Sequence, residues 1–360
     1  MKLKNIAIAF LGALLFATCS KKDDEKEYTA EESKAVVRST MDNFYNCLQN
    51  LNDGGFANFF HDLLFKETVR DHQGETQSWG NFLGEKFDKQ NFAEGLTEGD
   101  RFNYHRMKGT YTWNKNTELW EKTANNENVT FIFPATKGAT NNGKLVIDQY
   151  EDTETTYGND KVYLPTAAHL YATIDNTKVF EVTVKNVTFE KKTNFTMPLS
   201  AHISIYTNPF TTTIHWNRQN PENFVFDFAF SSPQGCTTGL HADIKLTTSD
   251  YGNISSLEKA IDKIAFTATQ GELRIVGNID VKSLEEKGND RKLRVEEINT
   301  YAKAVLMKGN SKIADVKYEE ENDKGVIYFI FSDGSREKAE KYVSDFEDRV
   351  TQIFKRFDRK

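Results

Sequence analysis

The chain has 360 residues, with 53 acidic and 46 basic side chains and a formal net charge of −7 at pH 7. An acidic chain of this kind is not expected to bind nucleic acid, which selects for basic surfaces. Its 27 phenylalanines, 14 tyrosines and 4 tryptophans can fill a sizeable core, so the length allows one large sheet domain or two smaller ones.

Residues 1–18 have the three parts of a secretory signal peptide. Lys2 and Lys4 supply the positive start, and the apolar run 6–16 is too short for an ordinary membrane-spanning helix. Small residues then lead directly into Cys19. This order favours cleavage before Cys19 and attachment of lipid to its thiol and its new amino group. The alternative is a plain signal peptide followed by a chance cysteine.

The residues after Cys19 form a charged tether, 19–28, which includes Lys22-Asp23-Asp24-Glu25. This segment resembles the export signal of the surface lipoproteins of the Bacteroidota. The resemblance covers only the leader and the tether, so the body is not assigned to a family. It implies acyl chains such as palmitate on Cys19, and an outer-membrane protein exposed at the cell surface. A solvated tether without a sorting role is the alternative, and the two are compatible.

Residues 29–100 have the pattern of a helical cap. Thr29 and Glu32 have the spacing of a capping box, in which the two side chains satisfy backbone donors at the start of a helix. Apolar residues then recur at helical spacing as far as Leu51, and the glycine pair 54–55 is expected to end this helix. Two further helices are predicted from the aromatic-rich clusters 56–65 and 79–87.

Residues 101–334 change to a period of two and predict a sheet body. Turn residues such as Asn141-Asn142-Gly143 and Asp175-Asn176 separate the apolar runs, so an antiparallel meander with one buried face is expected. The strand-like runs include 129–133, 180–184, 224–230, 264–269, 272–279, 302–307, 313–318 and 326–331. A capping box at 255–258 predicts a short helix that ends near Lys263, and the polar segment 282–297 predicts a loop and another helix.

Residues 335–360 predict an amphipathic C-terminal helix packed on the sheet. Its opposite side mixes acids and bases, which disfavours an anionic membrane surface, while docking of a partner stays open. The apolar stripe consists of Ala339, Tyr342, Val343, Phe346, Val350, Ile353, Phe354 and Phe357. The predicted class is therefore α+β, with a large curved antiparallel β-meander and N-terminal and C-terminal helices packed on one face.

Few motifs point to catalysis. The segment 138–145 has the glycine and lysine spacing of a P-loop, but Leu145 stands where a hydroxyl residue would hold magnesium, and a strand follows. A hairpin turn is favoured instead. Cys236, with His241 near it in sequence, could be a nucleophile, but a structural role is favoured. We predict no catalytic residue, no cofactor and no metal, and an enzyme is less favoured than a non-enzyme.

Two pairs of residues leave alternatives open. Cys47 and Cys236 could form a disulfide in an oxidising compartment, but a helix-borne and a loop-borne thiol need not meet. His202 and His215 would be cross-strand partners in a hairpin that is symmetric about Asn208-Pro209. They could then begin a metal site, although a third ligand would still be needed, and two solvated histidines are favoured.

The phenylalanines at 224, 226, 228 and 230 also allow two interpretations. They are sheet core, or they line an apolar cavity like that of half-barrel carriers. The predicted function is a membrane-anchored, non-catalytic binding or accessory protein of the outer membrane. Its partner would be an envelope protein, a glycan or an apolar ligand. The alternatives are a half-barrel carrier of an apolar ligand or lipid, and an extracellular polymer hydrolase with two facing carboxylates in an aromatic groove.

Overall fold

The computed structural model describes residues 26–70, 74–90, 92, 97–98, 101–157, 160–190, 197–250, 254, 257–289 and 291–357. The predicted signal peptide, Cys19 and residues 20–25 lie outside the described residues, as do Ser255 and Ser256 of the second capping box. The chain divides into two compact units. The first comprises Met1–Leu48 and Thr213–Gln352, and the second comprises Gln49–Thr212 and Ile353–Lys360.

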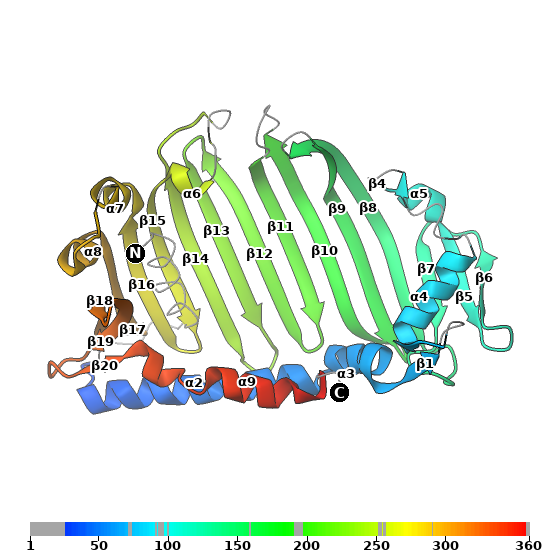
Figure 1. Ribbon diagram of the computed structural model, residues 1–360, viewed down its shortest axis with the longest axis horizontal. Coiled ribbons are helices and arrows are strands. Elements are labelled where there is room, and N and C mark those ends of the chain that lie inside the picture. The colour runs from blue at the N-terminus through cyan, green and yellow to red at the C-terminus, as the bar shows by residue number, and fades with distance from the viewer. Residues whose placement is uncertain are drawn as a thin grey trace. The chain divides into compact units, whose positions relative to one another are not determined.

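Sixteen of the described strands form one large sheet (Figure 1), and the pairs β1–β2 and β3–β4 form two small sheets of their own. Its order is β20-β19-β18-β17-β16-β15-β14-β13-β12-β11-β10-β9-β8-β7-β5-β6, so the predicted meander is confirmed from β7 to β20. Its strands are β5 (Gly109–Asn114), β6 (Leu119–Ala124), β7 (Val129–Phe133), β8 (Gly143–Tyr157), β9 (Asp160–Ile174), β10 (Thr177–Glu190), β11 (Met197–Thr207), β12 (Phe210–Asn220), β13 (Asn223–Ser231), β14 (Thr237–Leu246), β15 (Ile261–Gln270), β16 (Leu273–Asp280), β17 (Ala302–Lys308), β18 (Ser311–Glu321), β19 (Lys324–Ile330) and β20 (Arg336–Lys338).

One pairing departs from the antiparallel prediction. β5 pairs with β7 in parallel, from Gly109 opposite Val129 to Thr112 opposite Ile132. The reason lies in β6, which turns back along the outer side of β5. The next strand, β7, then runs in the direction of β5 and pairs with its other side. The sheet is therefore mixed at this end.

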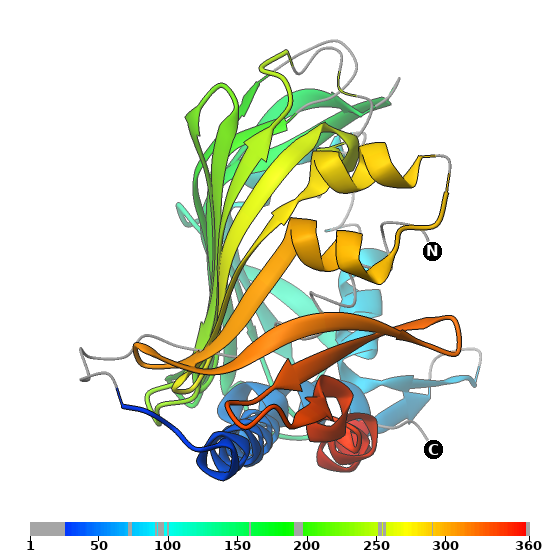
Figure 2. The same cartoon turned by 90° about the vertical axis from the view of Figure 1, so that its left-hand side faces the viewer.

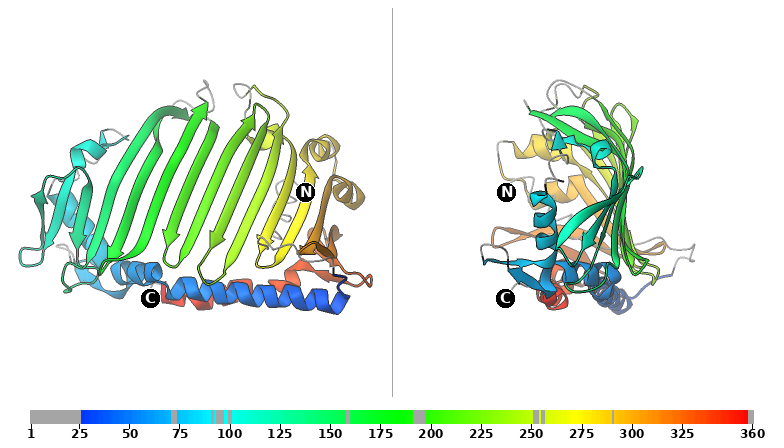
Figure 3. Two further views of the ribbon diagram at one scale, coloured as in Figure 1. Left: turned by 180° about the vertical axis from the view of Figure 1, so that it is seen from behind. Right: turned by 90° about the vertical axis from the view of Figure 1, so that its right-hand side faces the viewer.

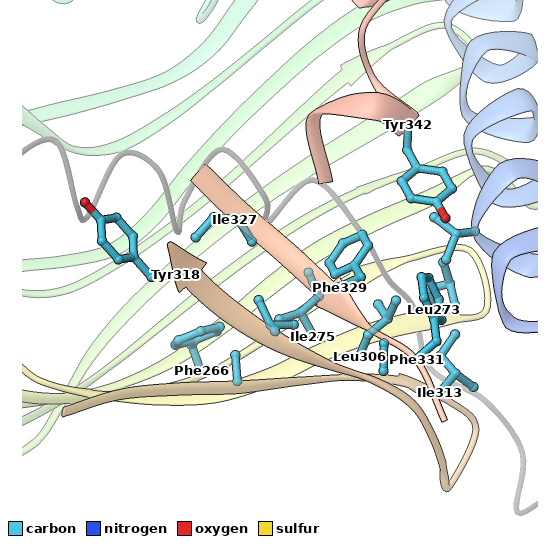
Figure 4. Close-up of a cluster of buried hydrophobic side chains, with 14 of the residues drawn as sticks. Phe266, Leu273, Ile275, Leu306, Ile313, Tyr318, Ile327, Phe329, Phe331 and Tyr342 are labelled. Atoms are coloured by element: carbon cyan, nitrogen blue, oxygen red, sulfur yellow. The ribbon is translucent and has the colours of Figure 1, made fainter. Parts of the chain in front are cut away.

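The core of the first unit lies between one face of its strands and the helices α2 (Ala30–Asp53), α7 (Val281–Gly288) and α8 (Val295–Tyr301). Figure 2 shows α7 and α8 on the side toward which β13–β16 curve. The predicted capping box begins α2, where the Thr29 amide donates to Glu32 and the Glu32 amide donates to the Thr29 hydroxyl. In Figure 4, Leu306, Phe329 and Phe331 lie together in this core.

A disulfide ties α2 to the turn between β13 and β14. Cys47 on α2 and Cys236 in that turn have their Cα atoms 5.7 Å apart, so the pairing that the sequence left open is present. The turn is closed by a hydrogen bond of 2.8 Å from the Ser232 amide to the Cys236 carbonyl. Since both sulfur atoms are bonded, the interpretation of Cys236 as a nucleophile is wrong.

The core of the second unit lies between α4 (Trp79–Lys89) and strands β5–β7. Figure 3 shows α4 on one side of the strands of this unit. The Trp79 indole donates to the Pro134 carbonyl at 2.8 Å, and the Trp120 indole donates to the Leu83 carbonyl at 2.9 Å. The predicted cap, 29–100, also contains α3 (Gly55–His61) and the π-helix η1 (Asp62–Lys66). It is not wholly helical, because it includes the short strands β1 (Thr68–Arg70), β2 (Thr76–Ser78) and β3 (Thr97–Glu98). The predicted sheet body begins with β4 (Arg101–Phe102) and α5 (Tyr104–Met107).

Helix α2 ends at Asp53, directly before the glycine pair, as predicted, and glycine is needed at position 54 for a steric reason. A Cβ atom at Gly54 would lie 2.2 Å from the carbonyl oxygen of Asn208, far inside contact distance. The Phe56 amide also donates to that carbonyl, at 3.3 Å. Only glycine therefore allows the chain to pass this close to the turn that follows β11.

The C-terminal segment is not the continuous helix that the stripe predicts. Arg336–Lys338 pairs with Tyr328–Ile330 as the edge strand β20, so a helix cannot begin at residue 335. The Tyr342 hydroxyl then donates to Glu337 at 2.6 Å, which holds the next turn against the sheet. The segment continues as a 3-10 helix η4 (Ala339–Tyr342), the helix α9 (Phe346–Phe354) and a 3-10 turn η5 (Lys355–Phe357). The side chain of Phe346 lies outside the described residues.

The short helix α6 (Leu257–Ala260) also ends earlier than predicted. We expected it to reach Lys263, but β15 begins at Ile261, which pairs with Leu246 of β14. The ladder with β14 continues through Lys263 and Ile264. Pairing with a neighbouring strand therefore overrides the local helical signal.

We predict that Phe329→Ala lowers the free energy of unfolding by about 3–5 kcal/mol, because it leaves a cavity in the first core. Phe329 is 1% exposed in the middle of β19. Val276→Ala is the control, since Val276 is 37% exposed, and its expected cost is about 1 kcal/mol or less. Denaturant unfolding followed by circular dichroism measures both. Equal losses in the two variants would contradict this account of the core.

Candidate ligand-binding site

The second unit contains a pocket of about 310 Å³ between β8, β9 and the segment that joins β4 to α5. This is within the lower part of the size range of small-molecule sites. The lining combines aromatic, hydroxyl, amide and charged side chains. It consists of Arg101, Phe102, Asn103, Tyr104, His105, Tyr150, Glu151, Asp152 and Thr166.

Short α5 is held in place by its cap and by one buried tyrosine. The Asn103 side-chain oxygen accepts a hydrogen bond of 3.2 Å from the Arg106 amide, as an N-cap residue does. Tyr104 is buried, and its hydroxyl lies 3.4 Å from the carbonyls of Glu127 and Ile147. These contacts fix the wall of the pocket that faces the sheet.

A β-bulge shapes the opposite wall. Glu151 pairs with Ala167, but the next residue, Asp152, pairs with Pro165, so Thr166 is an extra residue in β9. An unpaired residue of this kind bends its strand and redirects its side chain. Thr166 is one of the residues that line the pocket.

The single guanidinium of the lining is already paired. Arg101 Nε lies 2.9 and 3.1 Å from the two carboxylate oxygens of Asp152, and its Nη2 lies 2.8 Å from one of them. The Asp152 side chain is only 2% exposed, so this two-pronged contact is shielded from water on the carboxylate side. The guanidinium also lies over the ring of Tyr163, at 5.4 Å. The pair holds two walls of the pocket together.

Tyr150 provides both an aromatic surface and a hydroxyl. Its ring meets that of Phe102 edge to face, with centroids 4.9 Å apart. Burial raises the pKa of Tyr150, and the nearby Asp152 carboxylate raises it further, against the opposing effect of Arg101. The hydroxyl therefore stays protonated at neutral pH and can donate a hydrogen bond.

Several polar groups of the lining have no hydrogen-bond partner within the described part of the chain. They are the Tyr150 hydroxyl, the Asn103 side-chain nitrogen, the Thr166 hydroxyl and the exposed Glu151 carboxylate. The pocket thus offers donors and acceptors that the protein itself does not use. No motif in the sequence indicates this pocket, because Arg101 and Asp152 are separated by 51 positions.

The acids of the pocket do not face each other. Glu151 and Asp152 are consecutive residues of β8, and Asp152 is bound by Arg101. A glycoside hydrolase needs two carboxylates on opposite sides of the bond that is cleaved. The arrangement therefore lacks the two facing carboxylates by which a hydrolase would be recognised.

Histidine and carboxylate side chains contact one another in each unit. In the first unit, His241 Nδ1 lies 2.6 Å and His215 Nδ1 lies 3.3 Å from the carboxylate of Asp227. In the second unit, His169 lies between Asp148, at 2.6 Å, and Glu181, at 3.2 Å. These residues alternate along their strands with the apolar residues of the opposite face.

The metal site that His202 and His215 could begin has no third ligand in the described part of the chain. His202 stands opposite Lys185 in the pairing of β10 with β11, and His215 contacts Asp227. Among the residues that the structure describes, no three histidine, cysteine or acidic side chains are grouped to hold a metal ion. The mutual pairing of the two histidines stays a prediction.

The segment with P-loop spacing forms a turn followed by a strand. β8 begins at Gly143, within the motif, where a phosphate-binding loop would lead into a helix. Asn142 fixes the turn, since its side-chain oxygen accepts from the Ala135 amide at 3.1 Å. The preferred interpretation of a hairpin turn is confirmed.

The phenylalanine row of β13 is core at one end only. Phe224 is fully buried, whereas Phe226, Phe228 and Phe230 are half-buried. Phe226 packs against the core of the first unit. The core interpretation is therefore confirmed for Phe224 and Phe226, and the apolar cavity stays a prediction.

Comparison with known proteins does not add an identity. No family profile, no curated protein and no solved structure matches the chain. Within the described ranges, no helix has the length and apolar character needed to cross a membrane.

We predict that Asp227→Asn lowers the pKa of His241. The hydrogen bond to Asp227 is the main reason that this pKa lies above 6.5, with a smaller contribution from Asp243 and opposition from burial. A raised folded-state pKa stabilises the fold below pH 6.5, and this contribution is lost as the pH rises through the folded pKa. Titration by NMR of the imidazole carbons measures the shift.

Asp243→Asn is the control for this titration. Asp243 lies farther from His241, at 3.4 Å from Nε2, so its replacement should lower the pKa less. An unchanged His241 pKa in Asp227→Asn would show that the short contact does not control the ionisation.

Proposed function

We propose that the protein is an exported lipoprotein, anchored in the outer membrane through Cys19 and exposed at the cell surface, whose body binds a ligand without catalysis. The disulfide between Cys47 and Cys236 is the observation that carries export, because disulfides persist mainly outside the reducing cytosol. Of the three cysteines in the chain, Cys19 alone is left for lipid attachment.

The pocket supports the binding part of the proposal. It presents hydroxyl, amide and carboxylate groups that have no partner among the described residues, while its acids lack the facing arrangement of a hydrolase. Polar groups in fixed positions beside aromatic rings are the usual means by which a small site selects its ligand. We refer to this site as the Arg101 pocket.

We expect Cys19→Ala to release the protein from the membrane fraction or to leave an uncleaved precursor. The thiol is the proposed site of acylation, and no helix of the described ranges has the length and apolar character to cross a membrane. Fractionation and mass spectrometry of the mature amino terminus measure the outcome. Wild-type protein that carries no acyl chain would refute the anchor.

Replacement of residues 21–25 by alanine separates the surface proposal from the anchor. This variant should keep its lipid but stay on the periplasmic side, so protease added to intact cells should digest only the wild type. If both are digested equally, the acidic segment is only a tether.

An apolar carrier is the second candidate. It is favoured by the half-buried Phe226, Phe228 and Phe230 in the first unit and, in the second, by half-buried Leu170, Val182 and Ile205. In the second unit these three side chains follow one another across paired strands, on one face of the sheet. Such a face could hold an acyl chain.

For the carrier, we expect lipid to co-purify with the native protein and to be reduced by Phe228→Ser. Ala229→Ser is the matched control, because Ala229 is exposed and alternates to the other face of β13. Mass spectrometry of extracted ligands measures both. Lipid-free wild-type protein, or equal loss in the two variants, would exclude the carrier.

A further inference from the structure

We propose that the Arg101 pocket binds a neutral saccharide, which names the ligand class of the binding function proposed above and rests on it. The observation behind this proposal is the combination of a neutralised guanidinium, aromatic side chains and unused hydroxyl and amide groups in one pocket. Each of these features restricts the ligand in a different way.

The charge of the lining argues against an anionic ligand. Arg101 is matched by Asp152, so its charge is not available to attract a phosphate, sulfate or carboxylate. Glu151 is exposed at the same site and adds a negative charge that no described residue pairs with. Like charges brought together in a partly desolvated site repel one another, so nucleotides and acidic sugars are disfavoured.

The unused polar groups match a ligand rich in hydroxyls. A sugar hydroxyl donates one hydrogen bond and accepts others, so it pairs with both kinds of group. The Asn103 nitrogen donates, the Glu151 carboxylate accepts, and the hydroxyls of Tyr150 and Thr166 do both. A purely apolar ligand would leave all four groups without partners, at a cost in free energy for each.

The aromatic side chains of the lining match the apolar face of a sugar ring. One face of a pyranose ring exposes C–H groups between its polar edges, and such a face packs well on an aromatic ring. Phe102, Tyr104 and Tyr150 supply aromatic surface in the lining. A ligand with alternating polar edges and apolar faces therefore fits better than one with either character alone.

The walls of the Arg101 pocket are held in place by contacts within the protein itself. The Arg101–Asp152 pair, the Asn103 cap and the bulge at Thr166 each fix one part of the lining. Fewer groups then have to be ordered on binding, which favours affinity. The volume of about 310 Å³ suits a small unit, such as one residue of a longer chain.

The test uses the full chain, purified in detergent, on an array of neutral, sialylated and sulfated oligosaccharides. We expect selective binding of neutral oligosaccharides. The strongest of these is then titrated by calorimetry against the wild type, Asn103→Asp and Tyr150→Phe. Aspartate keeps the helix cap but loses the donor, and phenylalanine keeps the ring but loses the hydroxyl, so both variants should fold.

We expect each variant to bind about three- to tenfold more weakly, which is the effect of one lost hydrogen bond. Tyr171→Phe is the matched control and should bind like the wild type. Tyr171 stands opposite Val146 and so lies on the other face of the β8–β9 pair from Tyr150, which stands opposite Ala168. Circular dichroism confirms that all variants are folded.

Three results would overturn the saccharide proposal. They are the absence of neutral-glycan binding, a preference for acidic glycans, and equal affinities in Asn103→Asp, Tyr150→Phe and the wild type. None of them affects the lipid on Cys19 or the surface location, which the membrane experiments test separately. The saccharide proposal can therefore be refuted without refuting the proposal of an anchored binding protein.

Discussion

The core of the first unit depends on one contact between distant parts of the chain. Helix α2 brings Val37, Met41 and Tyr45 into one core with strands that follow residue 222, and the Cys47–Cys236 disulfide joins the same helix to the β13–β14 turn. A sheet face of Phe and Ile side chains is stable in water only when it is covered. Helix α2 lies near the amino terminus and the strands that it covers come later in the chain. The apolar face of these strands is therefore covered only when both parts of the chain have been synthesised.

The same constraint explains how much of the fold could be predicted. Apolar and polar residues must alternate along a strand that has one covered face. This period of two is visible in the sequence at 224–230, 264–269 and 302–307. The capping box at Thr29 is equally local, and its hydrogen bonds are present. Both features could be predicted from the sequence, because each depends only on residues that are close together in the chain.

The features of the fold and of the site that could not be predicted depend on pairing between distant parts of the chain. The stripe of residues 339–357 has helical spacing, yet β20 takes residues 336–338 into the sheet, and Glu337 then accepts from Tyr342. The spacing of apolar residues in the stripe does not indicate that β19 pairs with β20 or that Glu337 accepts from Tyr342. The Arg101 pocket is similar, because the guanidinium and its carboxylate come from β4 and β8, and the bulge at Thr166 exists only in the register of two paired strands.

The edges of the sheet bear on where a ligand can bind. The Gln90 side chain pairs with the backbone of edge strand β6 in both directions, at 2.7 Å from the Trp120 amide and 2.9 Å from its carbonyl. At the other end, β20 has only three residues and carries Arg336 and Lys338. A blocked edge and a short charged edge both disfavour the addition of a further strand. Recognition by strand addition is therefore less favoured than recognition through a face or a pocket. The Arg101 pocket offers such a place, because several of its polar groups have no partner among the residues that the structure describes.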